Sequence, residues 1–181
     1  MELKYTTQEQ DFLNSYLYVA NHTPQVIRQR RNTILILAGF GALATMFFFF
    51  RNDKGSTFYF LAFTIITAVV YPFYQRYFYK KQYLKHIRAN NHALFGKETV
   101  LTFNDTRING DSSLGSSSIP YESVKEICEI KELYLIRLLN NSTVVISKRD
   151  LSNTEKVTEY LKTLAGKIGV PYIDALNWKW K

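Results

Sequence analysis

The chain has 181 residues, enough for one domain of ordinary size and an additional segment. It carries 23 Lys and Arg against 15 Asp and Glu, and nearly all of the positive excess lies in residues 1–96, whereas residues 97–167 are neutral. A nucleic-acid-binding domain would carry such charge on its own surface, so this distribution argues against nucleic acid and favours anionic lipid headgroups.

Residues 1–31 are predicted to form a short strand and a helix. The strand is "ELKY", and we expect it to join the sheet of the downstream domain, because an isolated strand of this length is not stable. Thr6 and Glu9 match a capping box, which predicts a helix that begins near Thr7. Pro24 either ends this helix or begins the next one.

Residues 32–75 are predicted to form a transmembrane hairpin. Residues 32–50 carry no charge, and the second span, residues 56–75, lies in another charge-free run. At ~1.5 Å per residue, each span approaches the ~30 Å hydrocarbon layer of a bilayer. The alternative is a pair of buried core helices in a soluble protein, but residues 47–50 are four consecutive Phe with no polar face. The five-residue linker "RNDKG" makes the two helices antiparallel neighbours.

Small residues four positions apart occur in the first span. They are Gly41 with Thr45 and Ala38 with Ala42. Such pairs permit close helix packing, either within the hairpin or between protomers.

Basic residues predict the orientation of the hairpin. Eight flank the two spans on one side and only two, Arg51 and Lys54, lie at the tip. Because positive flanks stay in the cytoplasm, both termini are expected inside. Residues 76–96 are predicted to continue the second helix beyond the membrane, with basic side chains at its surface. The membrane-interface residues that we single out are Arg28, Arg30, Arg31, Arg76, Lys80 and Lys81.

Residues 97–168 have the pattern of a mostly β domain. "ETVLTF" and "TRING" are predicted strands joined at Asn104-Asp105, and "DSSLGSSS" is predicted to be a loop. "KEICEIK", "ELYLIRLL" and "STVVIS" are further strands, with a hairpin turn at Asn140-Asn141. Ser152 and Glu155 match a second capping box, which begins an amphipathic helix. Strands followed by one helix indicate an α+β roll, and residues 169–181 are left as a C-terminal tail.

This order of elements resembles a pleckstrin-homology-like roll, and the whole chain resembles the bacterial YcxB-like membrane proteins. Three segments carry the resemblance: "KYTTQEQDFLNSYLY", "SSSIPYESVKEI" and "VVISKRDLSNTEKVTEYLKTL". The chain departs from the family at Ser147, where a proline is usual. The resemblance implies a bacterial cytoplasmic (inner) membrane protein with two spans and both termini in the cytoplasm, and it supplies no catalytic residues.

The predicted fold class is therefore a membrane α+β protein. It consists of a two-helix transmembrane hairpin and a cytoplasmic pleckstrin-homology-like antiparallel sheet roll closed by a C-terminal helix.

Two pairs of side chains are candidate contact residues. Lys148 and Arg149 follow a predicted strand and are suited to a phosphate or an acidic peptide; alternatively they are a solvated edge or charge partners of Asp150. Trp178 and Trp180 alternate with lysines, which suits a membrane interface, although the tail can also fold back onto the sheet or lack order.

The remaining chemistry-bearing residues indicate no reaction. Cys128, the single cysteine, is predicted to be a structural strand residue, and the three histidines have no metal-ligand spacing. No serine-histidine-acid arrangement, cofactor motif or metal motif is predicted.

The sequence therefore predicts a non-enzymatic membrane-anchored interaction or regulatory protein. Its expected partners are anionic lipid headgroups and an unidentified protein or a second copy of the chain. The alternative is an accessory subunit of a membrane transport or envelope-assembly system. The absence of an ionisable residue in either span argues against an autonomous transporter.

Overall fold

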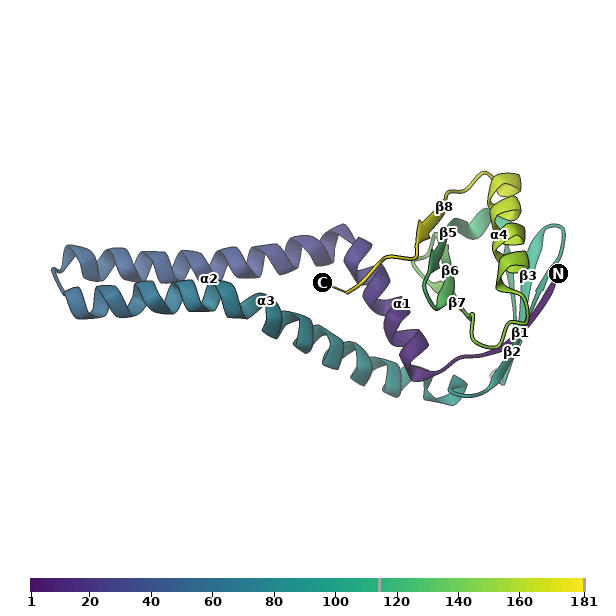
Figure 1. Ribbon diagram of the computed structural model, residues 1–181, viewed down its shortest axis with the longest axis horizontal. Helices are drawn as coiled ribbons and strands as arrows, with labels where there is room; N and C mark the ends of the chain where they lie inside the picture. The colour runs from purple at the N-terminus through teal and green to yellow at the C-terminus, as the bar shows by residue number, and fades with distance from the viewer. Residues whose placement is uncertain (114, 181) are drawn as a thin grey trace. The chain divides into compact units, whose positions relative to one another are not determined.

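A computed structural model describes residues 1–113 and 115–180 in two compact units (Figure 1). One comprises Met1–Leu17 and Leu84–Trp180, and the other Tyr18–Tyr83. The helices are α1 (Glu9–His22), α2 (Pro24–Phe50), α3 (Lys54–Asn91), the short 3₁₀ turns η1 (His92–Leu94) and η2 (Tyr121–Ser123), and α4 (Thr154–Ile168). The strands are β1 (Glu2–Thr6), β2 (Glu98–Phe103), β3 (Arg107–Ser112), β4 (Gly115–Pro120), β5 (Val124–Ile130), β6 (Leu133–Leu138), β7 (Thr143–Ser147) and β8 (Tyr172–Ala175).

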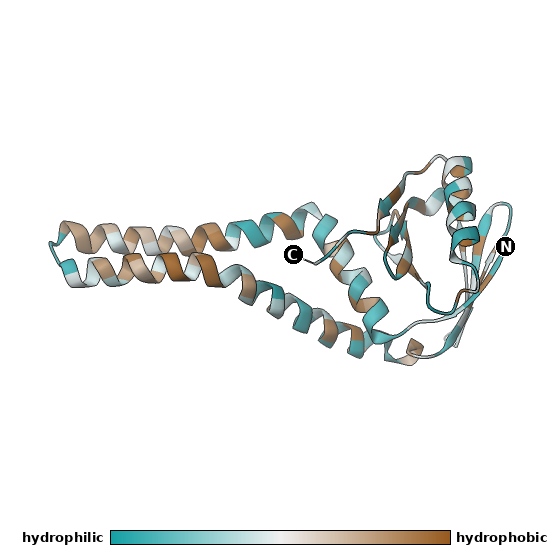
Figure 2. Cartoon of the chain, in the orientation of Figure 1, coloured by the Kyte–Doolittle hydropathy of each residue, from teal (hydrophilic) through white to brown (hydrophobic). Residues whose placement is uncertain are grey.

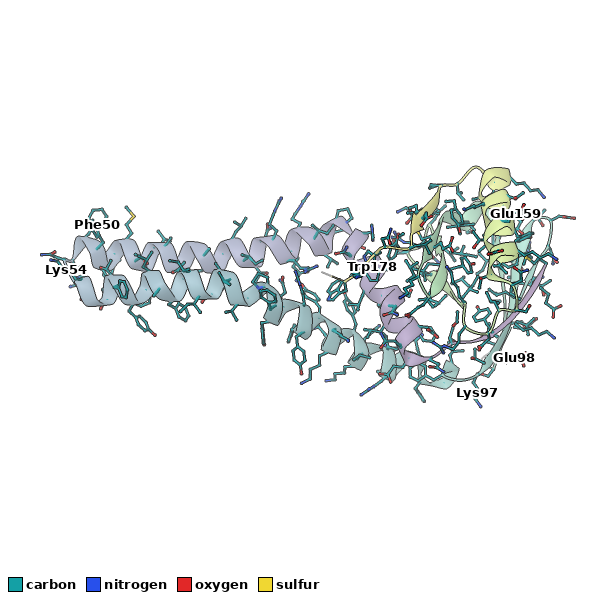
Figure 3. The ribbon with its side chains drawn as sticks, in the orientation of Figure 1. Phe50, Lys54, Lys97, Glu98, Glu159 and Trp178 are labelled. Atoms are coloured by element: carbon teal, nitrogen blue, oxygen red, sulfur yellow. The ribbon has the colours of Figure 1, made fainter. Side chains whose placement is uncertain are left out.

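The helical unit is a hairpin of α2 and α3, as predicted. Pro24 stands in the first turn of α2, where its missing N–H costs no hydrogen bond, so it begins this helix. At the tip, the Asp53 side chain accepts a hydrogen bond from the Ser56 N–H and caps the start of α3 (3.1 Å). Phe50 and Lys54 lie at this tip in Figure 3. The predicted helical continuation of the second span is also present, because α3 extends to Asn91.

Both hairpin helices are long and apolar enough to cross a membrane. Figure 2 shows the hydrophobic residues concentrated along them. Every residue of α2 is described and none is buried, and large apolar side chains such as Phe40 (71% exposed) and Phe58 (74% exposed) point outward. A core helix of a soluble protein would bury these side chains, so the alternative of two buried core helices does not fit the structure.

Gly41 is the point at which α2 approaches α3 closely. A Cβ atom added to Gly41 would overlap the Thr64 hydroxyl group of α3, whereas one added to Gly39 would meet nothing within 4 Å. Thr64 and Thr45 donate their hydroxyl hydrogens to carbonyl groups of their own helices, at 2.7 and 2.8 Å. Gly41 therefore serves packing within the hairpin, one of the two predicted uses of the small residues.

The other unit contains two four-stranded sheets. The first has the order β1-β2-β3-β4 and is antiparallel throughout. Leu3 pairs with Leu101 and Tyr5 with Thr99, so the N-terminal strand joins the downstream sheet, which confirms that prediction. The second sheet has the order β7-β6-β5-β8.

One core lies between the two sheets and α4. Its fully buried members include Ile127, Tyr134, Ile136, Ile146 and Leu161. The alternate residues of the second sheet, Cys128, Leu133 and Leu135 among them, are buried too, so this sheet is covered on both faces. The N-terminal part of α1 lies beside that sheet (Figure 1), where the Asn14 side chain donates a hydrogen bond to Glu132 (3.1 Å). Cys128 thus has the structural position predicted for it.

Two segments of this unit differ from the prediction. "DSSLGSSS" was expected to be a loop, but Gly115–Pro120 forms β4, whose serines pair in register with β3. Serine has a low strand propensity, and here backbone pairing overrides it, with Ser118 also donating to the Asn109 side chain (2.8 Å). The segment predicted as a tail contains β8, which runs parallel to β5, so the second sheet is not purely antiparallel. Gly169, with φ of 71°, ends α4 in the left-handed conformation and redirects the chain.

Both predicted capping boxes are shifted. Thr6 belongs to β1, and the carboxylate that bonds the backbone at the start of α1 is Asp11, which accepts from the Gln8 N–H (2.8 Å). Asn153, rather than Ser152, is the N-cap of α4 and accepts from the Lys156 N–H (2.9 Å). Asp11 thus takes the role predicted for the Glu9 carboxylate, and the Asn153 amide oxygen takes the role predicted for the Ser152 hydroxyl group.

Candidate functional site

Three consecutive side chains after β7, Lys148–Asp150, bind three separate elements of the same unit; we call this segment the latch turn. Lys148 Nζ donates to Glu129 Oε1 on β5 (2.6 Å). Arg149 Nη2 donates to Asp11 Oδ1 on α1 (3.1 Å). Asp150 Oδ2 accepts from the backbone N–H of Thr6 on β1 (2.9 Å) and from its hydroxyl group. The latch turn therefore fastens the N-terminal strand and helix to the downstream domain.

The Lys148 ammonium group lies in a polar network. Its partner Glu129 is buried and also accepts from the Tyr172 hydroxyl (2.5 Å) and the Thr158 hydroxyl (3.3 Å). Burial raises the pKa of Glu129, but the hydrogen bonds from Lys148, Tyr172 and Thr158 outweigh it, so that the pKa lies below its ordinary value. Burial and the neighbouring Glu129 raise the pKa of Tyr172. Lys148 also lies 4.5 Å from the centre of the Tyr134 ring.

The carboxylate of Asp11 is fully buried and needs its partners. It receives the Arg149 guanidinium on one oxygen and the Gln8 N–H on the other. A buried charge without such bonds would be strongly unfavourable. Arg149 is 45% exposed at its side chain, so its outer edge remains in contact with solvent.

Arg149 is in part a charge partner of Asp150, as the sequence alternative had it, because its charge helps to lower the pKa of Asp150, but the direct contacts of Lys148 and Arg149 are with other carboxylates. Both cations are engaged with carboxylates of their own chain, and Asp150 is held by Thr6. The partners of Arg149 and Asp150 lie 138 and 144 residues away, and no local spacing signals such pairs. A role of the two cations in binding a ligand stays a prediction.

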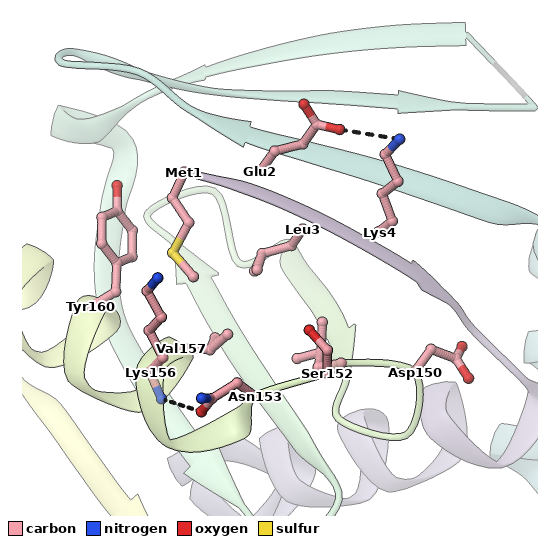
Figure 4. Close-up of a pocket in the computed structure, with 11 residues that line it drawn as sticks. Met1, Glu2, Leu3, Lys4, Asp150, Ser152, Asn153, Lys156, Val157 and Tyr160 are labelled. Atoms are coloured by element: carbon pink, nitrogen blue, oxygen red, sulfur yellow. Dashed lines mark hydrogen bonds and ion pairs between the residues drawn. The ribbon is translucent and has the colours of Figure 1, made fainter.

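A groove lies beside the latch turn, between β1 and the start of α4 (Figure 4). It has a volume of about 640 Å³, within the range of roughly 300–1,000 Å³ that ligand sites occupy. Its apolar wall is formed by Leu3, Leu151, Val157 and Tyr160. The residues that line the rest of the groove are Met1, Glu2, Lys4, Asp150, Ser152, Asn153 and Lys156, and the side chains of Glu2 and Lys4 point to the opposite face of the sheet. No pattern in the sequence indicates this groove, because its two sides are about 150 residues apart in the chain.

The predicted membrane-interface cations lie on the helices of the hairpin unit. Arg28, Arg31, Lys80 and Lys81 are exposed, whereas Arg30 and Arg76 are half-buried. Arg30 Nε lies 3.5 Å from the side-chain oxygen of Gln75, a buried residue of α3, and its guanidinium lies 5.9 Å from the Tyr79 ring centre. The helices thus present cations where the charge-free stretches end.

The two tail tryptophans are half-buried, and the Trp178 backbone N–H donates to the Ala175 carbonyl group (2.9 Å), which holds the turn after β8. Their predicted role as interface anchors stays a prediction. Among the residues that the structure describes, no group of three or more His, Cys, Asp or Glu comes together as a metal site.

Comparison of the chain with family models, with curated proteins and with solved structures gave no significant match.

Proposed function

We propose that this chain is a non-enzymatic, membrane-anchored interaction or regulatory protein. In this proposal α2 and α3 cross a bacterial cytoplasmic membrane as a hairpin, as in the YcxB-like proteins that the sequence resembles. The unit built from β1 to β8 is a pleckstrin-homology-like domain on the cytoplasmic side, which binds a protein partner or a second copy of the chain. The observation that carries the proposal is the outward-facing apolar surface of α2 and α3 in the same chain as a domain with a complete core.

The exposed side chains of the hairpin support the membrane anchor. In water, the exposed apolar side chains of α2 and α3, Phe40, Leu43 and Phe58 among them, would form a large apolar surface, which soluble monomers rarely tolerate. Away from its two end turns, an α-helix bonds its backbone N–H and C=O groups within itself, which suits it to hydrocarbon. Exposed Arg28, Arg31 and neighbouring cations lie beyond the apolar stretch, where anionic headgroups would contribute about 1 kcal/mol for each.

The arrangement of the sheets supports a pleckstrin-homology-like domain. Two sheets share one core, and the helix α4 contributes Val157, Leu161 and Leu164 to it. The first strand comes from the N-terminus, so the hairpin is an insertion between β1 and β2 of one domain. Such a domain would be held at the membrane surface by the two connections that lead into the hairpin.

The distribution of polar side chains supports binding rather than chemistry. Two ion pairs with a buried carboxylate, Glu129 with Lys148 and Asp11 with Arg149, join elements of the domain to one another. The groove between β1 and α4 is open and combines an apolar wall with a polar rim, as binding sites for polypeptides and small molecules do.

The anchor is tested by neutralising the six interface cations, Arg28, Arg30, Arg31, Arg76, Lys80 and Lys81, to glutamine. The unaltered protein should remain in the membrane after alkaline extraction, and its domain should be cleaved by protease only in opened vesicles. The neutralised protein should still insert but adopt both orientations, because the flank keeps two of its eight cations against two at the tip. Extraction of the unaltered protein as a soluble species would refute the anchor.

The interaction role is tested on the full-length protein purified in mild detergent. Lys156→Glu changes the charge at the rim of the groove, and Lys162→Glu is the matched control, because Lys162 is an exposed lysine of α4 that lies outside the groove lining. A protein or second copy that co-purifies with the unaltered chain and with Lys162→Glu, but not with Lys156→Glu, would support binding at this groove. Turnover of a substrate by the purified protein would contradict the non-enzymatic role.

A further inference from the structure

The strand β1 is an edge strand of the first sheet, and its hydrogen-bond pattern shows which of its backbone groups face outward. The Met1 amino group donates to the Phe103 carbonyl (3.2 Å), and the Phe103 N–H donates to the Met1 carbonyl (2.8 Å). In an antiparallel pair such mutually bonded residues alternate with residues whose N–H and C=O point away from the partner strand. Leu3 and Tyr5 therefore face β2, and Glu2, Lys4 and Thr6 face the open edge.

Thr6 provides independent evidence for this alternation. Its backbone N–H points away from β2 and donates to the Asp150 carboxylate. The latch turn thus closes the edge of β1 at its C-terminal end. The outward backbone groups of Glu2 and Lys4 have no strand beside them in the part of the chain that the structure describes, because β1 is the last strand on that side of the sheet.

The groove lies along this same open edge, since its lining includes Met1–Lys4. Figure 4 shows the side chain of Leu3 pointing toward Val157 and α4, while Glu2 and Lys4 point to the other face of the sheet and pair with each other. Charged side chains on an edge strand discourage unselective pairing with other sheets. Here the charged side chains of Glu2 and Lys4 lie on the opposite face of the sheet, so they do not cover the groove. A backbone edge beside an apolar wall is a combination that suits an added strand.

We infer that the edge of β1 binds an extended segment of a partner polypeptide, which adds to the first sheet as a fifth strand. The outward groups of Glu2 and Lys4 are two residues apart, about 6.6 Å along the strand, and that repeat matches the backbone of another extended chain. This inference rests on the proposed interaction function and names the class of its ligand.

The side-chain preference of the ligand follows from the pairing. In an antiparallel arrangement, ligand residues bonded to Glu2 and Lys4 share the outer face with them, so polar residues suit these positions. The ligand residue between them lies opposite Leu3 and points into the groove toward Val157 and Tyr160, so an apolar residue suits it. Asp150 ends the free edge at Thr6 and limits the added strand to a few residues.

The test uses the full-length protein in detergent micelles and an acetylated hexapeptide of alternating threonine and valine. Two analogues carry N-methyl groups on the threonines only or on the valines only. N-methylation of the threonines removes the donors that face β1 and should abolish binding, whereas N-methylation of the valines removes donors that face solvent and should leave it within about twofold. Binding is measured by fluorescence anisotropy of the labelled peptides.

Protein variants provide the matching control. Lys4→Pro removes the outward N–H without touching the bonds to β2, and a proline is tolerated at such an edge position. It should weaken binding about tenfold, whereas Lys4→Ala, which keeps the N–H, should change it little. Far-UV circular dichroism confirms that both variants are folded.

Failure of the hexapeptide to bind at millimolar concentration, or equal binding by Lys4→Pro and Lys4→Ala, would overturn the inference. The proposed function is judged separately by the co-purification experiment. If a partner is retained by Lys4→Pro and lost with Lys156→Glu, the interaction role stands and strand addition does not.

Discussion

In the hairpin the large apolar side chains point outward, whereas in the two-sheet unit they point inward. Phe40 and Leu43 of α2 are mostly exposed, and Ile136 and Leu135 of β6 are fully buried. The residue types are similar, so hydrophobicity alone does not determine the position of a side chain. The difference lies in the backbone. A helix satisfies most of its own backbone hydrogen bonds, so its side chains can face hydrocarbon. A sheet with exposed edges has unpaired backbone N–H and C=O groups that need water, so its apolar side chains are buried in a core instead.

Polar side chains differ between the two units in the same way. In the hairpin, the Thr45 and Thr64 hydroxyls bond carbonyl groups four residues earlier in their own helices. In the sheet unit, Arg149 and Asp150 bond residues at the other end of the chain. The polar contacts of the hairpin are therefore mostly local, with Arg30–Gln75 as an exception, whereas those that fasten the domain span the chain, and perturbations should affect the two units differently.

The largest expected effect comes from truncating a core side chain of the domain. Ile136→Ala should lower the free energy of unfolding of the domain by about 2–5 kcal/mol, because it leaves a cavity between the two sheets and α4. Leu43→Ala, at an exposed position of α2, should change that quantity by less than about 0.5 kcal/mol. Chemical denaturation in micelles, followed by circular dichroism, measures both. Equal losses would remove the contrast between the units.

The next effect concerns the long-range ion pair. Arg149→Met leaves the buried Asp11 carboxylate with the Gln8 N–H but without its cation, and should destabilise the domain by about 1–3 kcal/mol. Arg107→Met, at an exposed position on β3, is the control and should be close to neutral. Asp11→Asn combined with Arg149→Met should recover part of the loss, because no buried charge then remains. If the changes in unfolding free energy of the two single variants simply add up in the double variant, the two side chains do not interact.

An effect of similar size is expected at the close approach of the hairpin helices. Alanine stabilises a helix relative to glycine by about 0.5–1 kcal/mol. Gly39→Ala should therefore stabilise the hairpin by this amount, because the added Cβ meets open space. Gly41→Ala should lose roughly 1–3 kcal/mol relative to Gly39→Ala, since its Cβ would overlap the Thr64 hydroxyl and push α3 away. The distance between spin labels on α2 and α3 reports the separation. An unchanged separation would mean that the helices do not depend on this contact.

The local character of the hairpin explains why the sequence predicted it well. Length and absence of charge in residues 32–50 are visible in a single segment, and the antiparallel arrangement follows from a short linker. That β1 joins the downstream sheet was also predicted, because an isolated strand needs a sheet, whereas its partner β2 was not. β4 and β8 were missed, since serine-rich and tail-like segments carry no strand signal and their pairing depends on β3 and β5. The latch turn and the groove were missed because their parts meet only after folding.

The smallest expected effect is the pH dependence that Asp150 contributes. Hydrogen bonds from the hydroxyl and N–H of Thr6 hold the pKa of Asp150 below its ordinary value of 3.8. Because the folded-state pKa is the lower one, the carboxylate contributes stability above the unfolded-state value, and this stability is lost as the pH falls through the folded-state pKa.

Asp150→Asn keeps an oxygen that accepts from Thr6 but does not titrate. The unaltered protein should therefore be the more stable of the two near neutral pH, and the difference should disappear in acid below the ordinary value. Asp150 is exposed to solvent, so screening keeps the difference small compared with that of the buried pair at Asp11. Thermal unfolding of both proteins across the acid range measures it, and a difference that persists unchanged in acid would show that the charge of Asp150 does not fasten β1 to the latch turn.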